Sequence, residues 1–333
     1  MWFQRIFSPA KAQKVHSGLP GEQVNGLQVS ARALIQLNRL RLNTSRYLPG
    51  HGVGSRTSVR RKPAADFREH RMYVPGDDMR FVDWKASARQ EHIFIKQGEY
   101  QKKVNVYVLL DCSASMGWGE PPKAATALSL AAALGYSALT HGDRLTVVPL
   151  VDRNQLNGTA VRSMAPLGPI SGKGQFPGLL NYFRSLPFQG SIDLAEAIRH
   201  FSRRVAVGSG LVLLISDLLG NEPYSRAEIG SALEYLPMPT WNVVVLHLLH
   251  PAELKPTWRG EYEFFDIETG TTTNYDVTAK VLQAYQGRVQ AWREKLEFEC
   301  NENNALYSLI QSGCALDTEI IPILRDLNVV VPL

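Results

Sequence analysis

Three stretches of nearly continuous apolar residues are the feature that most constrains the fold of this chain. They are VNVYVLL at 104–110, LVLLIS at 211–216 and WNVVVLH at 241–247. Runs of this kind, without polar alternation, are typical of strands that are covered on both faces of a parallel sheet. Helical patterns lie between them, so the sequence predicts an α/β protein with a doubly wound, mostly parallel sheet of the Rossmann-like kind.

The intervening segments complete this pattern. A further strand is predicted at 144–151, with a short edge strand at 162–167. Residues 261–267 alternate polar and apolar for most of their length, and the segment 305–310 lies between the last two predicted helices. A strand at 92–96 and a helical spacing over 29–42 precede the regular part. Ser191 is placed to cap the helix that begins near residue 193. The remaining helices are predicted at about 121–140, 175–186, 193–206, 224–236, 276–303 and 318–327.

Charge is distributed unevenly along the chain. Residues 1–103 hold 19 Lys and Arg against 8 Asp and Glu, whereas residues 104–333 hold 17 against 23. This shift predicts a basic, partly β N-terminal region over 1–103 and an α/β domain over 104–333. The basic run at 60–62 suggests nucleic-acid binding as one alternative function. That segment has no interleaved aromatic residues, and no helix-turn-helix or zinc-finger spacing is visible.

Composition excludes several classes of protein. With 44% apolar and 20% charged residues over 333 positions, the chain can bury a sizeable core and is neither disordered nor a disulfide scaffold. Three scattered cysteines favour a reducing compartment. The longest uncharged helical run covers 124–140, shorter than the roughly 20 residues of a membrane span. Because no apolar segment of a signal peptide follows residue 7, we expect a cytoplasmic protein without integral membrane segments, with peripheral membrane contact left open.

Polar side chains stand where the predicted strands and loops end. Asp111, Ser113 and Ser115 follow the first apolar strand, Asp217 follows the second, and Ser191 precedes a helix. Ligands of an open parallel sheet bind outside the carboxyl ends of its strands, near the point where strand order reverses. Hydroxyl and carboxylate oxygens suit Mg²⁺, which takes six oxygen ligands and keeps several waters. The sequence therefore predicts a Mg²⁺ site, with Mn²⁺ or Ca²⁺ as alternatives.

Such a site leaves one coordination position open, and a carboxylate from another protein is its natural occupant. The pentapeptide at 111–115 is a weak signal by itself, because Ser and Asp are favoured as caps at any turn from strand to helix. Ser191 and Asp217, each in the expected context of the α/β alternation, strengthen the interpretation.

These five positions resemble the metal-ion-dependent adhesion site of von Willebrand factor A domains. Asp111, Ser113 and Ser115 match its Asp-x-Ser-x-Ser loop, Ser191 stands at its Thr position with the hydroxyl kept, and Asp217 matches its last acidic ligand. The resemblance implies a von Willebrand factor A-like fold and metal-dependent binding of a protein partner.

The chain resembles one bacterial family more closely, the domain of unknown function 58 (DUF58). The loop at 111–117 fits that family, as do residues 266–270 before a long helix. Members are commonly encoded beside MoxR-type AAA+ ATPases, which implies an adaptor or chaperone-like partnership with such an ATPase. A block over residues 71–89 also resembles the signature of this family, with arginines and aspartates interleaved around a Pro-Gly turn. These charges are expected to form an ion-pair network that fixes the N-terminal region to the α/β domain, and a second contact surface for a partner is the alternative. The block contains Arg71, Tyr73, Pro75, Gly76, Asp77, Asp78, Arg80, Asp83, Trp84, Ala88 and Arg89.

An enzyme is the competing hypothesis. A phosphatase using Asp111 as nucleophile needs an acid two residues later, where Ser113 stands. A serine hydrolase needs a Gly-x-Ser-x-Gly frame that neither Ser113 nor Ser115 has. We therefore expect a non-catalytic protein-interaction module without a small-molecule substrate, and metal-dependent hydrolysis stays as an alternative.

Overall fold

A computed structural model describes most of the chain, which divides into two compact units. One unit comprises residues 1–48 and 104–333, and the other comprises 49–103. The described residues are 27, 29–43, 67–75, 79–89, 92–98, 103–151, 164–205, 209–219, 229–265, 267 and 271–333.

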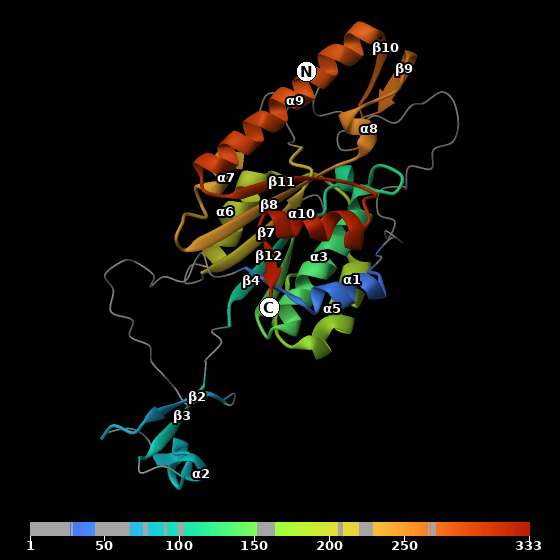
Figure 1. Ribbon diagram of the computed structural model, residues 1–333. Helices are drawn as coiled ribbons and strands as arrows, with labels where there is room; N and C mark the ends of the chain where they lie inside the picture. The colour runs from blue at the N-terminus through green and yellow to red at the C-terminus, as the bar shows by residue number, and fades with distance from the viewer. Residues whose placement is uncertain are drawn as a thin grey trace. The chain divides into compact units, whose positions relative to one another are not determined.

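The larger unit is an α/β body in which strands and helices alternate along the chain (Figure 1). Its strands are β1 (Leu40–Leu42), β4 (Asn105–Asp111), β5 (Arg144–Leu150), β6 (Leu167–Ile170), β7 (Gly210–Ser216), β8 (Trp241–Leu249), β9 (Gly260–Phe265), β10 (Thr272–Val277), β11 (Leu306–Gln311) and β12 (Val330–Pro332). Its helices are α1 (Ala31–Leu37), α3 (Lys123–Thr140), α5 (Phe176–Ser185), α6 (Leu194–Arg204), α7 (Ile229–Leu233), α8 (Pro251–Leu254), α9 (Ala279–Glu302) and α10 (Ile321–Asp326). Short turns of helix are η3 (Ala114–Gly117), η5 (Lys173–Gln175) and the π-helical η6 (Leu316–Ile320).

Six of these strands form one mixed sheet in the order β11-β8-β7-β4-β5-β6. The first five are parallel to their neighbours, and β6 pairs with β5 in antiparallel orientation at the edge. The predicted doubly wound, mostly parallel sheet is confirmed. Strand order reverses around β4, because β5 lies on one side of it and β7 on the other. The carboxyl end of β4 is therefore the switch point at which α/β sheets bind ligands.

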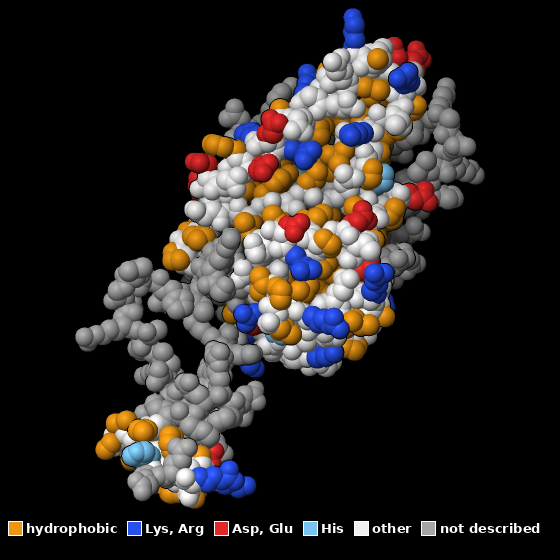
Figure 2. All heavy atoms as spheres, in the orientation of Figure 1, with side chains coloured by type: hydrophobic (Ala, Val, Ile, Leu, Met, Phe, Trp, Pro, Cys, Tyr) orange, Lys and Arg blue, Asp and Glu red, His pale blue; other side chains and the backbone are white. Residues whose placement is uncertain are grey.

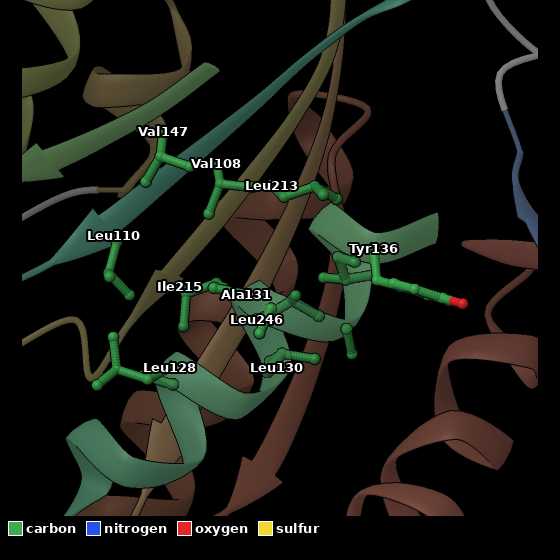
Figure 3. Packing of buried hydrophobic residues seen from close by; sticks show 14 of the residues in the cluster. Val108, Leu110, Leu128, Leu130, Ala131, Tyr136, Val147, Leu213, Ile215 and Leu246 are labelled. Carbon is green, nitrogen blue, oxygen red and sulfur yellow. The ribbon is translucent and has the colours of Figure 1, made fainter. Parts of the chain in front are cut away.

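Side chains of the central strands alternate between two cores. In β4, Val108 and Leu110 belong to the core beneath α3, whereas Tyr107 and Leu109 belong to the core beneath α6, α7 and α9. Figure 3 shows the first core, where sheet residues such as Ile215 and Leu246 lie beside Ala131 of α3. Both faces of the strands are thus covered, which explains their unbroken apolar sequences.

The helix predicted at about 121–140 is α3, and all but its last residue are buried. Close packing on its outer side depends on Gly135. A Cβ placed there would lie 2.7 Å from Cδ2 of Leu179 in α5. The small residue therefore lets α5 pack directly against α3.

The segment that includes α1 and β1 belongs to the α/β body. Leu37 of α1 is fully buried in the core beneath α3, and β1 pairs in antiparallel orientation with β12 near the C-terminus. The predicted division at residue 103 therefore differs from the structure for residues 31–42. The predicted helix over 29–42 also ends earlier, at Leu37, because the chain turns there to enter β1.

The smaller unit contains the hairpin of β2 (Phe67–Met72) and β3 (Phe94–Gly98), with η2 (Met79–Phe81) and α2 (Trp84–Ser87) between them. Asp83 caps α2, and its Oδ1 accepts hydrogen bonds from the backbone of Lys85 and Ala86. Asp77 and Asp78 lie outside the described residues. The expected ion-pair network of this block thus stays a prediction, while Asp83 has a local capping role.

Two element boundaries and one helix cap differ from the sequence predictions. The edge strand begins at Leu167, where the predicted strand ends, and residues 162 and 163 of that prediction lie outside the described residues. Of the helix predicted at 224–236, residues 224–228 also lie outside them, and α7 covers 229–233. Asp193, not Ser191, caps α6, because the Asp193 side chain accepts a hydrogen bond from the backbone of Glu196. The prediction that Ser191 caps this helix is wrong.

Among the described helices, none combines the length and the apolar character that crossing a membrane requires. Figure 2 shows one face on which basic and acidic side chains are interspersed over the described part of the α/β body.

Candidate functional site

Asp111 is the last residue of β4, and its buried carboxylate is held from two directions. Its Oδ1 accepts a hydrogen bond from the backbone N–H of Ser113 at 2.9 Å. Its Oδ2 accepts one from the hydroxyl of Ser216, the last residue of β7, at 2.6 Å. The sheet thus orients this carboxylate through the neighbouring strand, a contact that was not predicted from the sequence.

The two serines of the predicted loop lie side by side. Ser113 and Ser115 flank the start of η3, and their Oγ atoms are 2.9 Å apart. Both side chains are buried. The tight turn explains the closeness, since it brings residues two apart onto the same side. The structure therefore brings both hydroxyls together, as the spacing predicted.

The loop that carries Ser191 is attached to the same turn by backbone hydrogen bonds. The N–H of Ala114 donates to the carbonyl of Gly190 at 2.8 Å, and the N–H of Gln189 donates to the carbonyl of Cys112 at 2.9 Å. Ser191 is buried and directly follows this attachment. Three distant stretches of the chain therefore reach one end of the sheet.

Asp217 follows β7 and is fully buried. Its Oδ1 accepts a hydrogen bond from the backbone of Leu219 at 3.2 Å. Its Oδ2 lies 2.8 Å from the Nζ atom of Lys123. The next residue, Leu218, has a φ of 54°, a left-handed conformation that is uncommon outside glycine. The chain thus turns sharply just after this carboxylate.

Lys123 is a member of the site that was not predicted from the sequence. It is the first residue of α3, it is fully buried, and its Nζ also lies 2.7 Å from Oε1 of Glu253 in α8. A positive charge at the first turn of a helix interacts unfavourably with the helix dipole. A lysine at the start of an apolar helix is therefore unusual, and this could have drawn attention to Lys123 in the sequence. Nothing in the sequence pattern indicates which carboxylates it meets.

A neutral histidine lies behind Asp217. Nε2 of His247 in β8 is 3.0 Å from the carbonyl oxygen of Asp217, and Nδ1 is 2.7 Å from the hydroxyl of Tyr307. Burial lowers the pKa of His247 to about 3. Because a carbonyl only accepts, the single N–H of the neutral ring is on Nε2, and Nδ1 accepts from Tyr307. His247 therefore supports the Asp217 backbone.

Burial and the charge of Asp217 raise the proton affinity of Asp111 and Glu253. Burial, followed by the charge of Asp217, raises the pKa of Asp111 to about 6. Burial likewise raises the pKa of Glu253. Burial opposes the charge of Lys123, but Asp217 and Glu253 together raise its pKa above the ordinary value. The site contains three carboxylates, Asp111, Asp217 and Glu253, and one ammonium, that of Lys123. This excess of negative charge favours the binding of a further positive charge.

The donor chemistry of the predicted set fits a hard divalent cation. Two carboxylates and three hydroxyls are all oxygen donors, and a Mg²⁺ site with few protein carboxylates keeps water ligands. Among the described residues, no group of three or more His, Cys, Asp or Glu side chains gathers in a metal-binding arrangement. A site of Ser and Asp side chains is of a different kind, because its hydroxyls supply most of the donors.

The family of the chain follows from its sequence. The family described as "Protein of unknown function DUF58" matches residues 69–295, which is more than half of the chain. The chain belongs to this family. The matched region includes β4, η3 and β7, and it contains all five predicted site residues.

Curated relatives of this DUF58 protein are mycobacterial. It is 25% identical over 255 residues to "Uncharacterized protein Rv1480" of Mycobacterium tuberculosis, a region that covers 72% of this chain and 73% of the relative. The same values hold for "Uncharacterized protein Mb1516" of Mycobacterium bovis.

Solved structures with related architecture are distant. The conserved hypothetical protein BatB from Bacteroides thetaiotaomicron is 14% identical with a TM-score of 0.38, covering 67% of this chain and 98% of its own. An aerotolerance-related membrane protein from Bacteroides fragilis is 17% identical with a TM-score of 0.37, covering 68% and 98%. The SpRpn10 VWA domain is 8% identical with a TM-score of 0.33, covering 66% and 94%. These likenesses are too weak to indicate a function.

Proposed function

We propose that this DUF58 protein is a non-catalytic protein-interaction module that binds an acidic side chain of a partner through a divalent cation. Asp111, Ser113, Ser115, Ser191 and Asp217 hold the cation, which is Mg²⁺, with Mn²⁺ or Ca²⁺ as substitutes. The observation that carries the proposal is the pair of hydroxyls 2.9 Å apart beside the buried carboxylate of Asp111. When bound, the cation supplies a positive charge with an open coordination position for the partner's carboxylate.

The position of the cluster supports a binding role. It lies where the chain leaves β4 and β7, at the switch point of the sheet, where α/β proteins bind their ligands. The surplus of buried carboxylates favours a cation, and a hard cation recruits another oxygen ligand. The partner is proposed to be a MoxR-type AAA+ ATPase, a choice that rests on the family resemblance. A cytoplasmic location stays a prediction.

The chemistry of the neighbouring groups supports binding rather than catalysis. Position 113 holds a serine where a phosphatase would need an acid, and that hydroxyl lies against Ser115. His247, the histidine that contacts the Asp217 backbone, is buried, and its two ring nitrogens already contact the Asp217 carbonyl and Tyr307. It therefore has no free nitrogen with which to activate a serine.

The proposal is tested by metal binding and metal-dependent capture. Mg²⁺ binding to the full-length chain is measured by titration calorimetry. Binding to a purified MoxR-type AAA+ ATPase from the same organism is measured with Mg²⁺ and with a chelator. We expect Mg²⁺ binding, capture that requires it, and loss of both in Asp111→Ala.

Two serine variants provide a matched comparison. Ser115→Ala removes a buried hydroxyl at the site, whereas Ser137→Ala removes a buried hydroxyl of α3 that bonds to the carbonyl of Leu40. Only Ser115→Ala is expected to weaken Mg²⁺ binding. Equal affinities in both variants, or capture that is indifferent to the chelator, would overturn the proposal.

A further inference from the structure

The ammonium group of Lys123 supplies the candidate site with a cation from the chain itself. Its Nζ lies 2.8 Å from Oδ2 of Asp217 and 2.7 Å from Oε1 of Glu253. The lysine and Asp217 side chains are fully buried, and that of Glu253 is 12% exposed. A charge taken out of water to this extent is stable only with close partners, so this ammonium belongs to the construction of the site.

Asp217 is the carboxylate that Lys123 and a divalent cation would share. One of its oxygens contacts the ammonium, and the other accepts a hydrogen bond from the backbone of Leu219. A divalent cation and an ammonium repel each other strongly at contact distance in a buried environment. Full contact of both with Asp217 is therefore unfavourable, and each weakens the binding of the other.

Glu253 is the second carboxylate that the ammonium contacts, and it is held in place by hydrogen bonds of its own. Its Oε2 accepts a hydrogen bond from the backbone of His250 at 2.6 Å, in a capping box that starts α8. The backbone carbonyl of Glu253 accepts a hydrogen bond from the hydroxyl of Tyr285 in α9 at 2.7 Å. Because the carboxylate is fixed and the lysine side chain is flexible, Lys123 keeps a partner when it leaves Asp217.

We propose that Lys123 is the resident cation of this site. Its ammonium occupies Asp217 when no metal is bound, and it withdraws to Glu253 alone when a divalent cation binds. This inference rests on the proposed function for the binding of the cation itself. Lys123 thereby lowers metal affinity, keeps the buried carboxylates compensated in the absence of metal, and links metal occupancy to Glu253 and its contact with α9.

The first test compares Mg²⁺ affinity, by calorimetry on the full-length chain, between the wild type and Lys123→Met. Removal of the competing ammonium is expected to tighten Mg²⁺ binding by about tenfold. If Lys123 had a purely structural role, its loss would leave the affinity for Mg²⁺ unchanged or would reduce it. Lys295→Met is the matched control, because the Lys295 side chain is 48% exposed and pairs with Glu299 within α9. This variant should bind Mg²⁺ as tightly as the wild type does.

The second test uses Glu253→Gln, which keeps the lysine and therefore stays informative if Lys123→Met does not fold. Without its alternative partner the ammonium stays on Asp217, so Mg²⁺ binding should weaken about threefold or more. If Glu253 acts through Lys123, adding Glu253→Gln to Lys123→Met should change the affinity much less than it does in the wild type.

Thermal denaturation gives a readout independent of calorimetry. Addition of Mg²⁺ should raise the midpoint of Lys123→Met more than that of the wild type, because the metal replaces the missing charge. If the wild type binds Mg²⁺ but Lys123→Met binds it no more tightly, the resident-cation inference is overturned and the metal site stands. If neither protein binds Mg²⁺ or Mn²⁺, the proposed function fails and the inference fails with it.

Discussion

The hydroxyl of Ser216 donates a hydrogen bond of 2.6 Å to Oδ2 of Asp111, and so joins the ends of two neighbouring strands. Ser216 ends β7 and Asp111 ends β4. Both side chains are buried. The same Ser216 oxygen accepts a hydrogen bond from the backbone of Leu218, at the start of the sharp turn after Asp217. One hydroxyl thus orders both carboxylate-bearing strand ends.

Ser216→Ala should therefore destabilise the fold. A buried hydrogen bond to a charged group contributes about 1.5–3 kcal/mol to stability, and this is the loss expected in the free energy of unfolding. Urea denaturation measures it. Ser185→Ala is the control, because that hydroxyl is exposed and donates to the nearby carbonyl of Tyr182. Equal stabilities of the two variants would show that the Ser216 contact contributes little.

Leu37→Ala tests whether the segment before residue 43 is part of the α/β body. Leu37 is fully buried in the core beneath α3, so its truncation should reduce the free energy of unfolding by about 2–5 kcal/mol. Ile35, in the same helix, is 59% exposed, and Ile35→Ala should change the free energy of unfolding by about 0.5 kcal/mol or less. Chemical denaturation of both variants is the measurement. A small effect of Leu37→Ala would contradict the assignment of α1 to the body.

Gly210→Ala is expected to strain the start of β7. A Cβ at this position would lie 2.1 Å from the carbonyl oxygen of Asn105 in the neighbouring strand β4. The strands must shift to accept it, at a cost of about 1–3 kcal/mol in stability. Gly287→Ala in α9 meets open space and should stabilise the protein by about 0.5–1 kcal/mol. Opposite signs in urea denaturation confirm the prediction, and a neutral Gly210→Ala contradicts it.

The three cysteines should differ in reactivity. All are free thiols; Cys112 and Cys300 are buried, and Cys314 is partly exposed. Burial raises the pKa of Cys300 to about 12 and that of Cys112 well above its ordinary value. The thiolate is the reactive form, so neither should react near neutral pH while the protein is folded.

Iodoacetamide labelling followed by mass spectrometry measures this difference. Only Cys314 should be modified in the folded protein, at a slow rate because burial also raises its pKa. All three should react in denaturant, and Cys314→Ser should be inert when folded. Modification of Cys112 under native conditions would show that the loop after β4 opens to solvent.

Much of the fold could be predicted because its signals are local. The apolar stretches at 104–110, 211–216 and 241–247 correspond to β4, β7 and β8. The pair of hydroxyls at Ser113 and Ser115 also follows from local spacing. In contrast, Ser191 and Asp193 are both good caps, and only the backbone geometry at the start of α6 selects Asp193.

The sequence by itself determined the alternation of strands and helices and the placement of Asp111 and Asp217 at strand ends, because hydrophobic periodicity and polar residues at loop positions are properties of neighbouring residues. Only the tertiary structure decided which charges share a partner. Lys123 meets Asp217, 94 residues away, and Glu253, 130 residues away. Those contacts depend on how α3 and α8 pack where β7 and β8 end, which no local pattern records.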